Sequence, residues 1–295
     1  MLTDPTQLSK ALKNAQSLYN YDAVTCVFDP SLEAEACGCP VIWGDDYDIP
    51  SVSAHPAGDL AEISRIDITD IATRGRLPVV VEAAKRLKIA LGRRVAIVGV
   101  VTGPLTLAGS LIGRDIIEAL DERQEEAQSL VAVAARVAVE VCKAYCSLEL
   151  DGVMVADRFA SRLPLKHSDK LRSLLTPLWN IVRFHNAYSI LWSEKGDPSA
   201  LECLCSAGAD AVAAAVTPGF ADLKTMMVNK SNLVFGAAIP STLLASGATE
   251  LEEYVTNYLR AGTDRRMFLT TEGEVPGNTS PEHIHGIMKA IASPR

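Results

Sequence analysis

Acidic side chains stand directly after the predicted strands of this chain. Asp29 follows VTCVF, Asp157 follows VMVA, Glu194 follows SILWS and Glu272 follows MFLTT. Because the carboxyl ends of parallel strands meet on one side of a barrel, we expect these four carboxyls to share one rim. Neighbouring buried carboxylates repel one another, so the pKa of one can rise until it serves as a general acid near neutral pH. The pattern therefore predicts an acid-rich catalytic mouth.

Other residues at the same strand ends predict a substrate pocket. Trp192 supplies an aromatic wall, while Arg158 and Glu274 stand beside two of the acids. Thr102 ends another strand, and Thr217 ends a further one. Each acid taken singly is also explained as a helix cap or a solvent-exposed charge, so the prediction depends on their convergence.

The cysteines do not predict a metal centre. Two C-x-C pairs, at 37–39 and 203–205, lack a second pair or a His-x3–5-His at zinc spacing, and core packing explains them better. The total of seven cysteines is odd and favours reduced thiols in the cytoplasm. A P-loop, a GxSxG motif and a Ser–His–Asp signature are also absent from the sequence.

The elements that must position these residues alternate between strand and helix. The organising stretch, residues 95–113, begins as a β-branched strand, breaks at Gly103-Pro104 and continues with small residues that start a helix. Its nineteen uncharged residues also meet a crude count for a membrane span, but the Gly-Pro break and the β-rich first half argue against one. We expect strands near 21–30, 95–102, 151–157, 187–192, 211–216, 233–236 and 267–270, and helices near 5–19, 31–39, 76–91, 115–148, 169–184, 198–207, 219–228, 249–261 and 280–292.

This alternation over 295 residues predicts an α/β fold, a (β/α)8 TIM barrel in one domain. A doubly wound open sheet is the alternative, weakened because no GxGxxG follows the first strand. The net charge of −8 argues against a nucleic-acid partner. A polar start without an apolar h-region predicts a cytoplasmic protein with no membrane association.

Six motifs in order resemble the uroporphyrinogen decarboxylase superfamily, especially its corrinoid-dependent methyltransferase branch. They are DPSLEAEACGCPVIW (29–43), GPLTLAGSLIG (103–113), DGVMVADRFAS (151–161), SILW followed by GD (189–197), AGAD (207–210) and EGEVPGNTSPEHI (272–284). The resemblance implies the same barrel fold over residues 1–295. The family's N-terminal extension is expected to be absent, because the first motif acid is already Asp29.

Departures from the family pattern change the expected chemistry. The decarboxylases' catalytic aspartate matches Asp29, but their tyrosine, serine and histidine fall at Ser110, Arg158 and Glu272. Their arginine-rich segment that grips substrate carboxylates is missing. Decarboxylation of a porphyrinogen is therefore not expected.

The thiol-directed methyltransferases of the family hold zinc through His-x-Cys and a later Cys. Those positions are Trp192, Glu194 and Glu272 here, so the zinc that activates a thiol loses its usual ligands. A non-thiol substrate is implied. Whether the two carboxylates hold a metal instead stays open.

The resemblance implies an enzyme of the O-demethylase type in anaerobic one-carbon metabolism. It moves a methyl group from a phenyl methyl ether to cob(I)alamin on a separate corrinoid-binding protein. Glu272 or Glu194 is expected to protonate the phenolate or hold a metal ion, while Asp29 and Asp157 orient the substrate or corrinoid. The expected substrate contacts are Trp192, Arg158, Ser110 and Glu274, and the expected cofactor contacts are Gly103 and Pro104.

Two alternatives remain at this point. A methylcorrinoid-dependent enzyme could methylate tetrahydrofolate or a thiol. A decarboxylase-like barrel could also bind ligands without catalysis.

Overall fold

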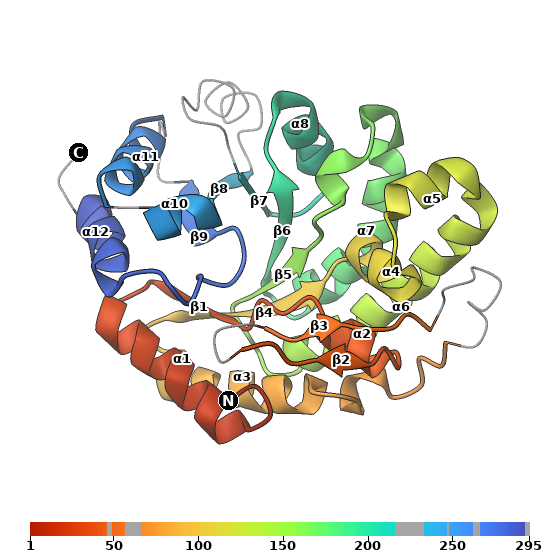
Figure 1. Ribbon diagram of the computed structural model, residues 1–295, viewed down its shortest axis with the longest axis horizontal. Coiled ribbons are helices and arrows are strands. Elements are labelled where there is room, and N and C mark those ends of the chain that lie inside the picture. The colour runs from red at the N-terminus through yellow and green to blue at the C-terminus, as the bar shows by residue number, and fades with distance from the viewer. Residues whose placement is uncertain (46–48, 57–65, 216–232, 247, 262–265, 293–295) are drawn as a thin grey trace.

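The computed structural model describes residues 1–45, 49–56, 66–215, 233–246, 248–261 and 266–292. Within these ranges seven strands form one sheet in which every pair is parallel. In spatial order they are β1 (Ala23–Cys26), β4 (Ala96–Thr102), β5 (Gly152–Ala156), β6 (Tyr188–Lys195), β7 (Ala211–Ala215), β8 (Val234–Ile239) and β9 (Met267–Thr271). The sheet curls, and helices cover its outer side (Figure 1).

The spatial order of the strands is also their sequence order, which decides between the two expected folds. A doubly wound sheet reverses its order at a switch point, and this sheet does not reverse. The expected strand positions and the parallel α/β sheet are confirmed. A complete barrel of eight strands is not seen in the described ranges: the sheet there has seven strands, one for each strand segment expected above, and no strand pairing joins β9 to β1.

The helices that follow the strands agree closely with the expected segments, with one correction. They are α1 (Pro5–Tyr19), α2 (Leu32–Ala36), α3 (Leu77–Leu91), α4 (Pro104–Ile112), α5 (Ile116–Glu122), α6 (Gln124–Cys146), α7 (Ser168–Phe184), α8 (Pro198–Ser206), α10 (Ser241–Ser246), α11 (Ala248–Ala261) and α12 (Pro281–Ala292). The single long helix expected over 115–148 is wrong. Arg123, with φ −133° and ψ 64°, separates α5 from α6.

Short elements complete the described chain. A short hairpin consists of β2 (Val41–Ile42) and β3 (Ser51–Val52), which pair antiparallel. Three 3₁₀ turns are η2 (Ile71–Thr73), η3 (Ala160–Arg162) and η4 (Leu165–His167). The helix expected at 219–228 and the strand-end residue Thr217 lie outside the described residues.

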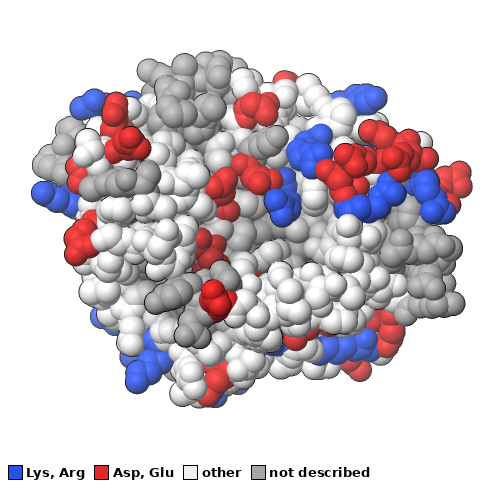
Figure 2. All heavy atoms as spheres, viewed as in Figure 1, with Lys and Arg blue, Asp and Glu red and all other residues white. Residues whose placement is uncertain are grey.

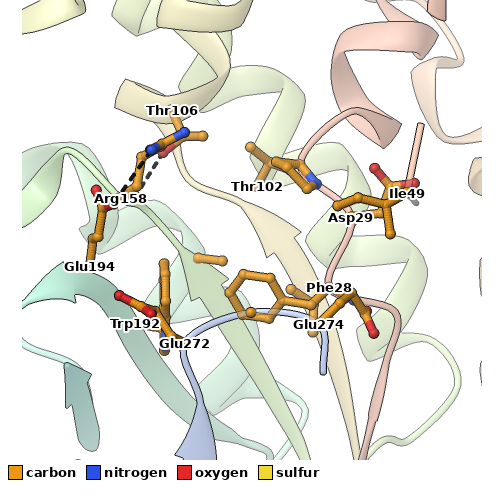
Figure 3. A pocket seen from close by; sticks show the side chains of 14 residues that line it. Phe28, Asp29, Ile49, Thr102, Thr106, Arg158, Trp192, Glu194, Glu272 and Glu274 are labelled. Carbon is orange, nitrogen blue, oxygen red and sulfur yellow. Dashed lines mark hydrogen bonds and ion pairs between the residues drawn. The ribbon is translucent and has the colours of Figure 1, made fainter. Parts of the chain in front are cut away.

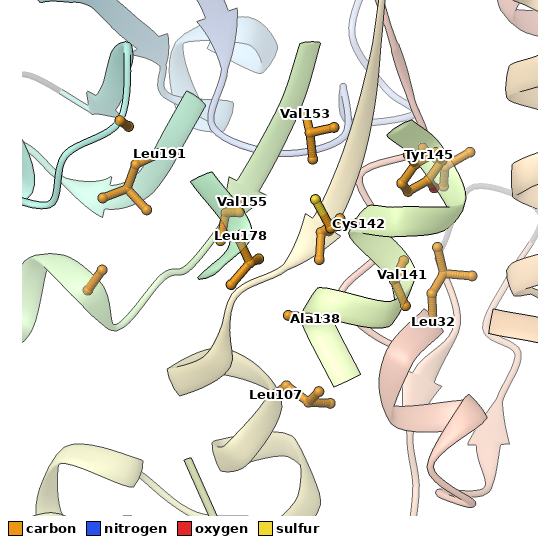
Figure 4. Packing of buried hydrophobic residues seen from close by; sticks show 14 of the residues in the cluster. Leu32, Leu107, Ala138, Val141, Cys142, Tyr145, Val153, Val155, Leu178 and Leu191 are labelled. Atoms are coloured by element: carbon orange, nitrogen blue, oxygen red, sulfur yellow. The ribbon is translucent and has the colours of Figure 1, made fainter. Parts of the chain in front are cut away.

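Two apolar layers pack against the curled sheet. The outer layer lies between the strands and helices α6 and α7, where residues such as Val153, Ala138 and Leu178 meet (Figure 4). The smaller inner layer includes Val98 and Val100 of β4. Alternate residues of one strand thus enter different layers, which explains why its whole run is apolar.

The uncharged stretch at 95–113 is divided between β4 and α4. Among the described residues, no helix combines the length and apolarity that crossing a bilayer requires. The strand–turn–helix interpretation of this stretch is confirmed.

Candidate active site

A cavity of about 230 Å³ lies at the carboxyl ends of the strands. Figure 2 shows a hollow near the middle of this face with acidic side chains beside it. Seven of the predicted residues line the cavity: Asp29, Thr102, Arg158, Trp192, Glu194, Glu272 and Glu274 (Figure 3). Asp29 follows the first strand and Glu272 the last, so the expectation that the two share one rim is confirmed.

Asp29 is held in a buried ion pair that the sequence did not reveal. Its Oδ2 lies 2.5 Å from Nη1 of Arg76, and its Oδ1 accepts from the backbone and hydroxyl of Ser31. Arg76 also contacts Glu35 at 2.7 Å, and both Asp29 and Arg76 are buried. The negative charge of Asp29 is therefore paired with Arg76, and the two hydrogen bonds from Ser31 hold its carboxylate in one orientation.

Arg76 also connects the cavity rim to the β2–β3 hairpin. Its guanidinium lies 5.2 Å from the ring centroid of the half-exposed Trp43. Arg76 directly precedes α3, and 47 residues separate it from Asp29. Its position in the sequence matches none of the strand ends, so the pattern that found the acids could not find it.

The backbone turns sharply between β1 and Asp29. Val27 has φ 53°, a left-handed conformation that a β-branched residue rarely adopts. The next residue, Phe28, packs edge-on against Trp192 with ring centroids 4.8 Å apart. The two rings make the aromatic wall of the cavity, of which the sequence predicted only Trp192.

Asp157 lies behind the cavity wall instead of lining it. Its carboxylate accepts hydrogen bonds from the N–H groups of Leu105, Thr106 and Phe159 and from the Thr106 hydroxyl. Complete burial raises the pKa of Asp157 to about 6, although these hydrogen bonds act in the opposite direction. Asp157 thus caps the start of α4 and fixes the β5 end, which is the helix-cap alternative noted above.

The turn before α4 is shaped to fit Asp157. A Cβ on Gly103 would lie 2.2 Å from the Cβ of Asp157, so only glycine fits there. Gly103, Pro104 and Ser110 do not line the cavity. The Ser110 hydroxyl donates to the Thr106 carbonyl within α4.

Two further acids at the rim have partners. Glu194 lies 3.5 Å from the half-exposed guanidinium of Arg158, and the Arg158 backbone N–H donates to Thr106 (Figure 3). Glu272 accepts from the backbone N–H of Ser241 at 2.9 Å, at the start of α10. Of these charged groups, Arg158 is the cation that lines the cavity.

A buried carboxyl lies next to the cavity without belonging to the predicted set. Glu33 is 1% exposed, and it accepts from both the N–H (2.9 Å) and the hydroxyl (2.5 Å) of Thr102. Burial raises the pKa of Glu33 to about 7. In the sequence Glu33 stands in the first turn of a short helix. Acids are common there because they interact favourably with the helix dipole, so the sequence did not mark Glu33 as a site residue.

The donor atoms present do not fit the zinc site of the thiol-directed relatives. The three corresponding residues are an indole, Trp192, an ion-paired Glu194 and Glu272, which caps α10. Within the described part of the chain, no three His, Cys, Asp or Glu side chains gather closely enough to hold a metal ion.

Comparison with known proteins gives a family match and several relatives. The sequence matches the family model described as uroporphyrinogen decarboxylase (URO-D) over residues 1–293. The methylcobamide:CoM methyltransferase MtaA of Methanosarcina barkeri is 24% identical over 265 residues, 89% of this chain and 78% of that protein. MtbA of Methanosarcina mazei, described by the same activity, is 26% identical over 158 residues, 54% of this chain and 46% of that protein. The chain thus covers about half the length of the second relative.

Solved structures share the fold at low identity. A methyltransferase from Methanosarcina mazei matches 98% of this chain and 85% of that chain, with a TM-score of 0.83 and 22% identity. A B12-independent methionine synthase from Shewanella sp. W3-18-1 matches 97% of this chain and 86% of that chain, with a TM-score of 0.60 and 12% identity. These similarities establish the arrangement of the chain in space.

Proposed function

The chain belongs to the uroporphyrinogen decarboxylase family, and from this premise we propose that it is a corrinoid-dependent methyltransferase. Its methyl donor is a small phenyl methyl ether, and its acceptor is a corrinoid on a separate protein. The observation that carries the proposal is the cavity itself, which combines an aromatic wall with charged groups at the strand ends. Relatives described as methylcobamide:CoM methyltransferases support the class of reaction.

The cavity size suits the donor and not the corrinoid. Pockets that enclose drug-sized ligands measure about 300–1,000 Å³. A cavity of about 230 Å³ takes a single substituted benzene ring and leaves a corrin macrocycle outside, over the mouth. The corrinoid supplies the cobalt that takes the methyl group. Gly103 and Pro104 are buried and do not line the cavity, so we assign them a role only in the shape of the α4 turn.

The aromatic wall orients the ether. Trp192 is 4% exposed, and its ring packs against Phe28 at the inner end of the cavity. Stacking of an aromatic substrate against such a wall contributes about 0.5–1.5 kcal/mol beyond the burial of its area. We propose that an ether stacked on this wall directs its methyl group toward the mouth.

Charged groups at the rim stabilise the leaving oxygen. The methyl–oxygen bond breaks with both electrons remaining on oxygen, so a phenolate charge develops inside the cavity. Arg158 lines the cavity and meets that charge, and Glu194 holds the guanidinium in place. We assign Glu272 to the positioning of the last strand end, and Asp29 and Glu274 to the positioning of the β1 end. Asp157 and Ser110 act through α4.

We extend the proposal to the whole fold and its compartment. A closed (β/α)8 barrel in one domain is supported by the sequential order of the parallel strands. It is also supported by the hydrogen bond between the segment that follows β1 and the segment that follows β9. A cytoplasmic location is supported by the cysteines, none of which forms a disulfide bond in the described structure.

The test is optical. Cob(I)alamin is mixed with the protein and a panel of methoxylated benzenes, and its absorbance is followed. We expect conversion to methylcobalamin only when protein and ether are both present. Arg158→Gln should slow the reaction, while Arg172→Gln, on the exposed side of α7, is the matched control. Absence of conversion with every ether and with a corrinoid-protein partner would refute the proposed donor.

A second candidate is methyl transfer from a methylcorrinoid to a thiol. It is favoured by one observation, the described activity of the relatives toward CoM. The same assay run from methylcobalamin with a thiol, or with tetrahydrofolate, distinguishes the two directions. Absence of transfer in both directions would favour the alternative of a barrel that binds ligands without catalysis.

A further inference from the structure

We propose that Glu33 and Thr102 form a protonation-controlled hydrogen-bond donor in the cavity wall. When Glu33 carries a proton, the Thr102 hydroxyl donates to an oxygen bound in the cavity; when Glu33 is ionised, the hydroxyl is turned away. The pair rests on the proposed function only for the identity of that oxygen, the ether oxygen that becomes a phenolate. Its hydrogen-bonding behaviour follows from the wall itself.

Thr102 faces the cavity because of its position in β4. Val98 and Val100 of the same strand belong to the inner layer, and Thr102 continues their row by the two-residue period of a strand. Its side chain lines the cavity (Figure 3). Glu33 approaches it from α2 and is hidden from solvent.

The two hydrogen bonds fix where a proton on Glu33 must go. Oε1 accepts from the Thr102 backbone N–H, whose hydrogen cannot turn elsewhere. Oε2 faces the Thr102 hydroxyl at 2.5 Å. A proton added to Glu33 therefore lies on Oε2 and points to the Thr102 oxygen, which then accepts.

A hydroxyl group carries a single hydrogen. The direction of the Glu33–Thr102 bond therefore decides whether the Thr102 hydroxyl presents a hydrogen-bond donor or only an acceptor to the cavity. With Glu33 ionised, the Thr102 hydrogen is used by Oε2, and the cavity meets only an acceptor. With Glu33 protonated, the hydrogen is free to point into the cavity. The developing charge of a phenolate is an acceptor for it.

The surroundings of Glu33 favour a proton near neutral pH. Burial is the main cause, and the carboxylate of Asp29 adds to it, although Arg76 pairs with that carboxylate. The other titratable groups near Glu33 are the thiol of Cys37 and the hydroxyl of Tyr145, both uncharged because burial raises their pKa values above the usual range. No cation among these neighbours contacts Glu33 directly in the described structure.

The proton transfer balances. As the methyl–oxygen bond breaks, the leaving oxygen takes the Thr102 hydroxyl hydrogen, and the Thr102 oxygen takes the proton from Glu33. The methyl group passes to the corrinoid of the proposed function, whose cobalt supplies the electron pair. The products are a neutral phenol and an ionised Glu33, which regains a proton from solvent before the next turnover.

The experiment measures binding without a corrinoid or a methyl donor. Pentafluorophenolate is the probe, because it stays ionised between pH 6 and 8, and fluorine NMR reports its affinity. For the unaltered protein we expect the affinity to fall about tenfold or more over this range, the effect of one hydrogen bond to a charged group. Glu33→Gln mimics the protonated acid, since its amide both accepts from the Thr102 N–H and donates to the hydroxyl, and it should bind tightly at every pH.

Thr102→Val separates the hydrogen bond from simple charge repulsion. Loss of the Thr102 hydroxyl also raises the pKa of Glu33, so the affinity of Thr102→Val is compared on both sides of its own Glu33 titration, which infrared spectroscopy locates. An ionised Glu33 repels the probe in both proteins, so repulsion alone would give the same loss of affinity across that titration, and that result would overturn the proposal. We expect weak binding and a much smaller pH dependence, with recovery in Thr102→Ser. Glu253→Gln, an exposed carboxyl on α11, is the control and should behave as the unaltered protein.

Infrared spectroscopy gives a readout that needs no ligand. A carboxylic acid band that disappears between pH 6 and 8, and that is missing in Glu33→Gln, supports the proposal; no such band overturns it. Failure of methyl transfer with an intact band and an intact pH-dependent affinity would refute the proposed function and leave the switch standing.

Discussion

The backbone N–H of Phe28 donates a 2.5 Å hydrogen bond to the carboxylate of Glu274, across 246 residues of sequence. Phe28 follows the first strand of the sheet and Glu274 follows the last. The bond therefore joins the two edges of the curled sheet at the rim of the cavity. At this rim the hydrogen bond holds the two edges together, as backbone hydrogen bonds between paired strands do elsewhere in the sheet.

We predict that Glu274→Ala loosens this junction. A hydrogen bond to a charged group contributes about 1.5–3 kcal/mol, and the exposure of Glu274 reduces this, so the free energy of unfolding should fall by about 1 kcal/mol. Urea denaturation measures it. Glu253→Ala, an exposed acid on α11, should change the value by less than about 0.5 kcal/mol. Equal effects of the two substitutions would contradict the assignment.

Gly103→Ala should be destabilising. Its Cβ would overlap Asp157, so either α4 or the β5 end must shift, and overpacking of this kind costs about 1–3 kcal/mol. Gly286→Ala is the matched control in the interior of α12, where the nearest obstacle is the flexible end of Glu252. It should be neutral or stabilising by up to about 1 kcal/mol. Thermal unfolding of the two variants tests the contrast.

The stability of the protein should fall as pH rises, and Glu33 should cause part of this fall. The folded state raises the pKa of Glu33 from 4.5 to about 7, so it holds a proton that the unfolded chain has lost. The stabilising contribution is complete below pH 4.5 and disappears as pH rises through 7, by about 3 kcal/mol. Unfolding experiments from pH 4.5 to 8 should show Glu33→Gln gaining on the unaltered protein with rising pH. A constant difference would mean that Glu33 does not titrate in this window.

Arg76→Ala should be among the most destabilising single substitutions in the chain. It leaves the buried carboxylate of Asp29 without its cation, and breaking a buried ion pair costs about 3–5 kcal/mol. Removing both charges in Arg76→Met with Asp29→Leu should recover part of the loss. If the free energy lost in the double variant equals or exceeds the sum of the losses in Arg76→Met and Asp29→Leu alone, the ion pair is not the cause.

Arg158→Gln should lower the rate of methyl transfer with little effect on stability. The side chain is half-exposed and its contact with Glu194 is 3.5 Å, so little folding energy depends on it. Loss of one electrostatic contact to a developing oxyanion costs about 10²–10³-fold in kcat. Single-turnover kinetics separate this from a change in KM. A change in KM alone would indicate that Arg158 only binds the ether.

The strands and most helices could be predicted because their pattern is local. The apolar run before Thr102, the Pro that begins α4 and the Gly that ends α3 each mark an element within a few residues. The break at Arg123 could not be predicted, because good helix formers continue on both sides and only the tertiary arrangement separates α5 from α6.

The cavity was predicted in part for a similar reason. The rule that strand ends face the site found seven lining residues, since it depends on topology alone. The same rule placed Asp157 in the cavity, although three hydrogen bonds from Leu105 and Thr106 hold its carboxylate against α4 and a fourth comes from Phe159. Arg76 and Glu33 reach the rim from outside the strand ends, so their roles depend on folded contacts that no spacing encodes.

The left-handed Val27 implies that this rim is a strained joint. A non-glycine residue in such a conformation costs on the order of 1–3 kcal/mol, which the rest of the fold must supply. Glycine at this position would relieve the strain. It would also make the backbone more flexible at the point that positions Phe28 against Trp192 and Asp29 against Arg76. The sequence with the highest thermal stability and the sequence with the highest substrate selectivity are therefore expected to differ. A screen for heat-resistant variants would select substitutions of Val27, the residue whose conformation orients the aromatic wall.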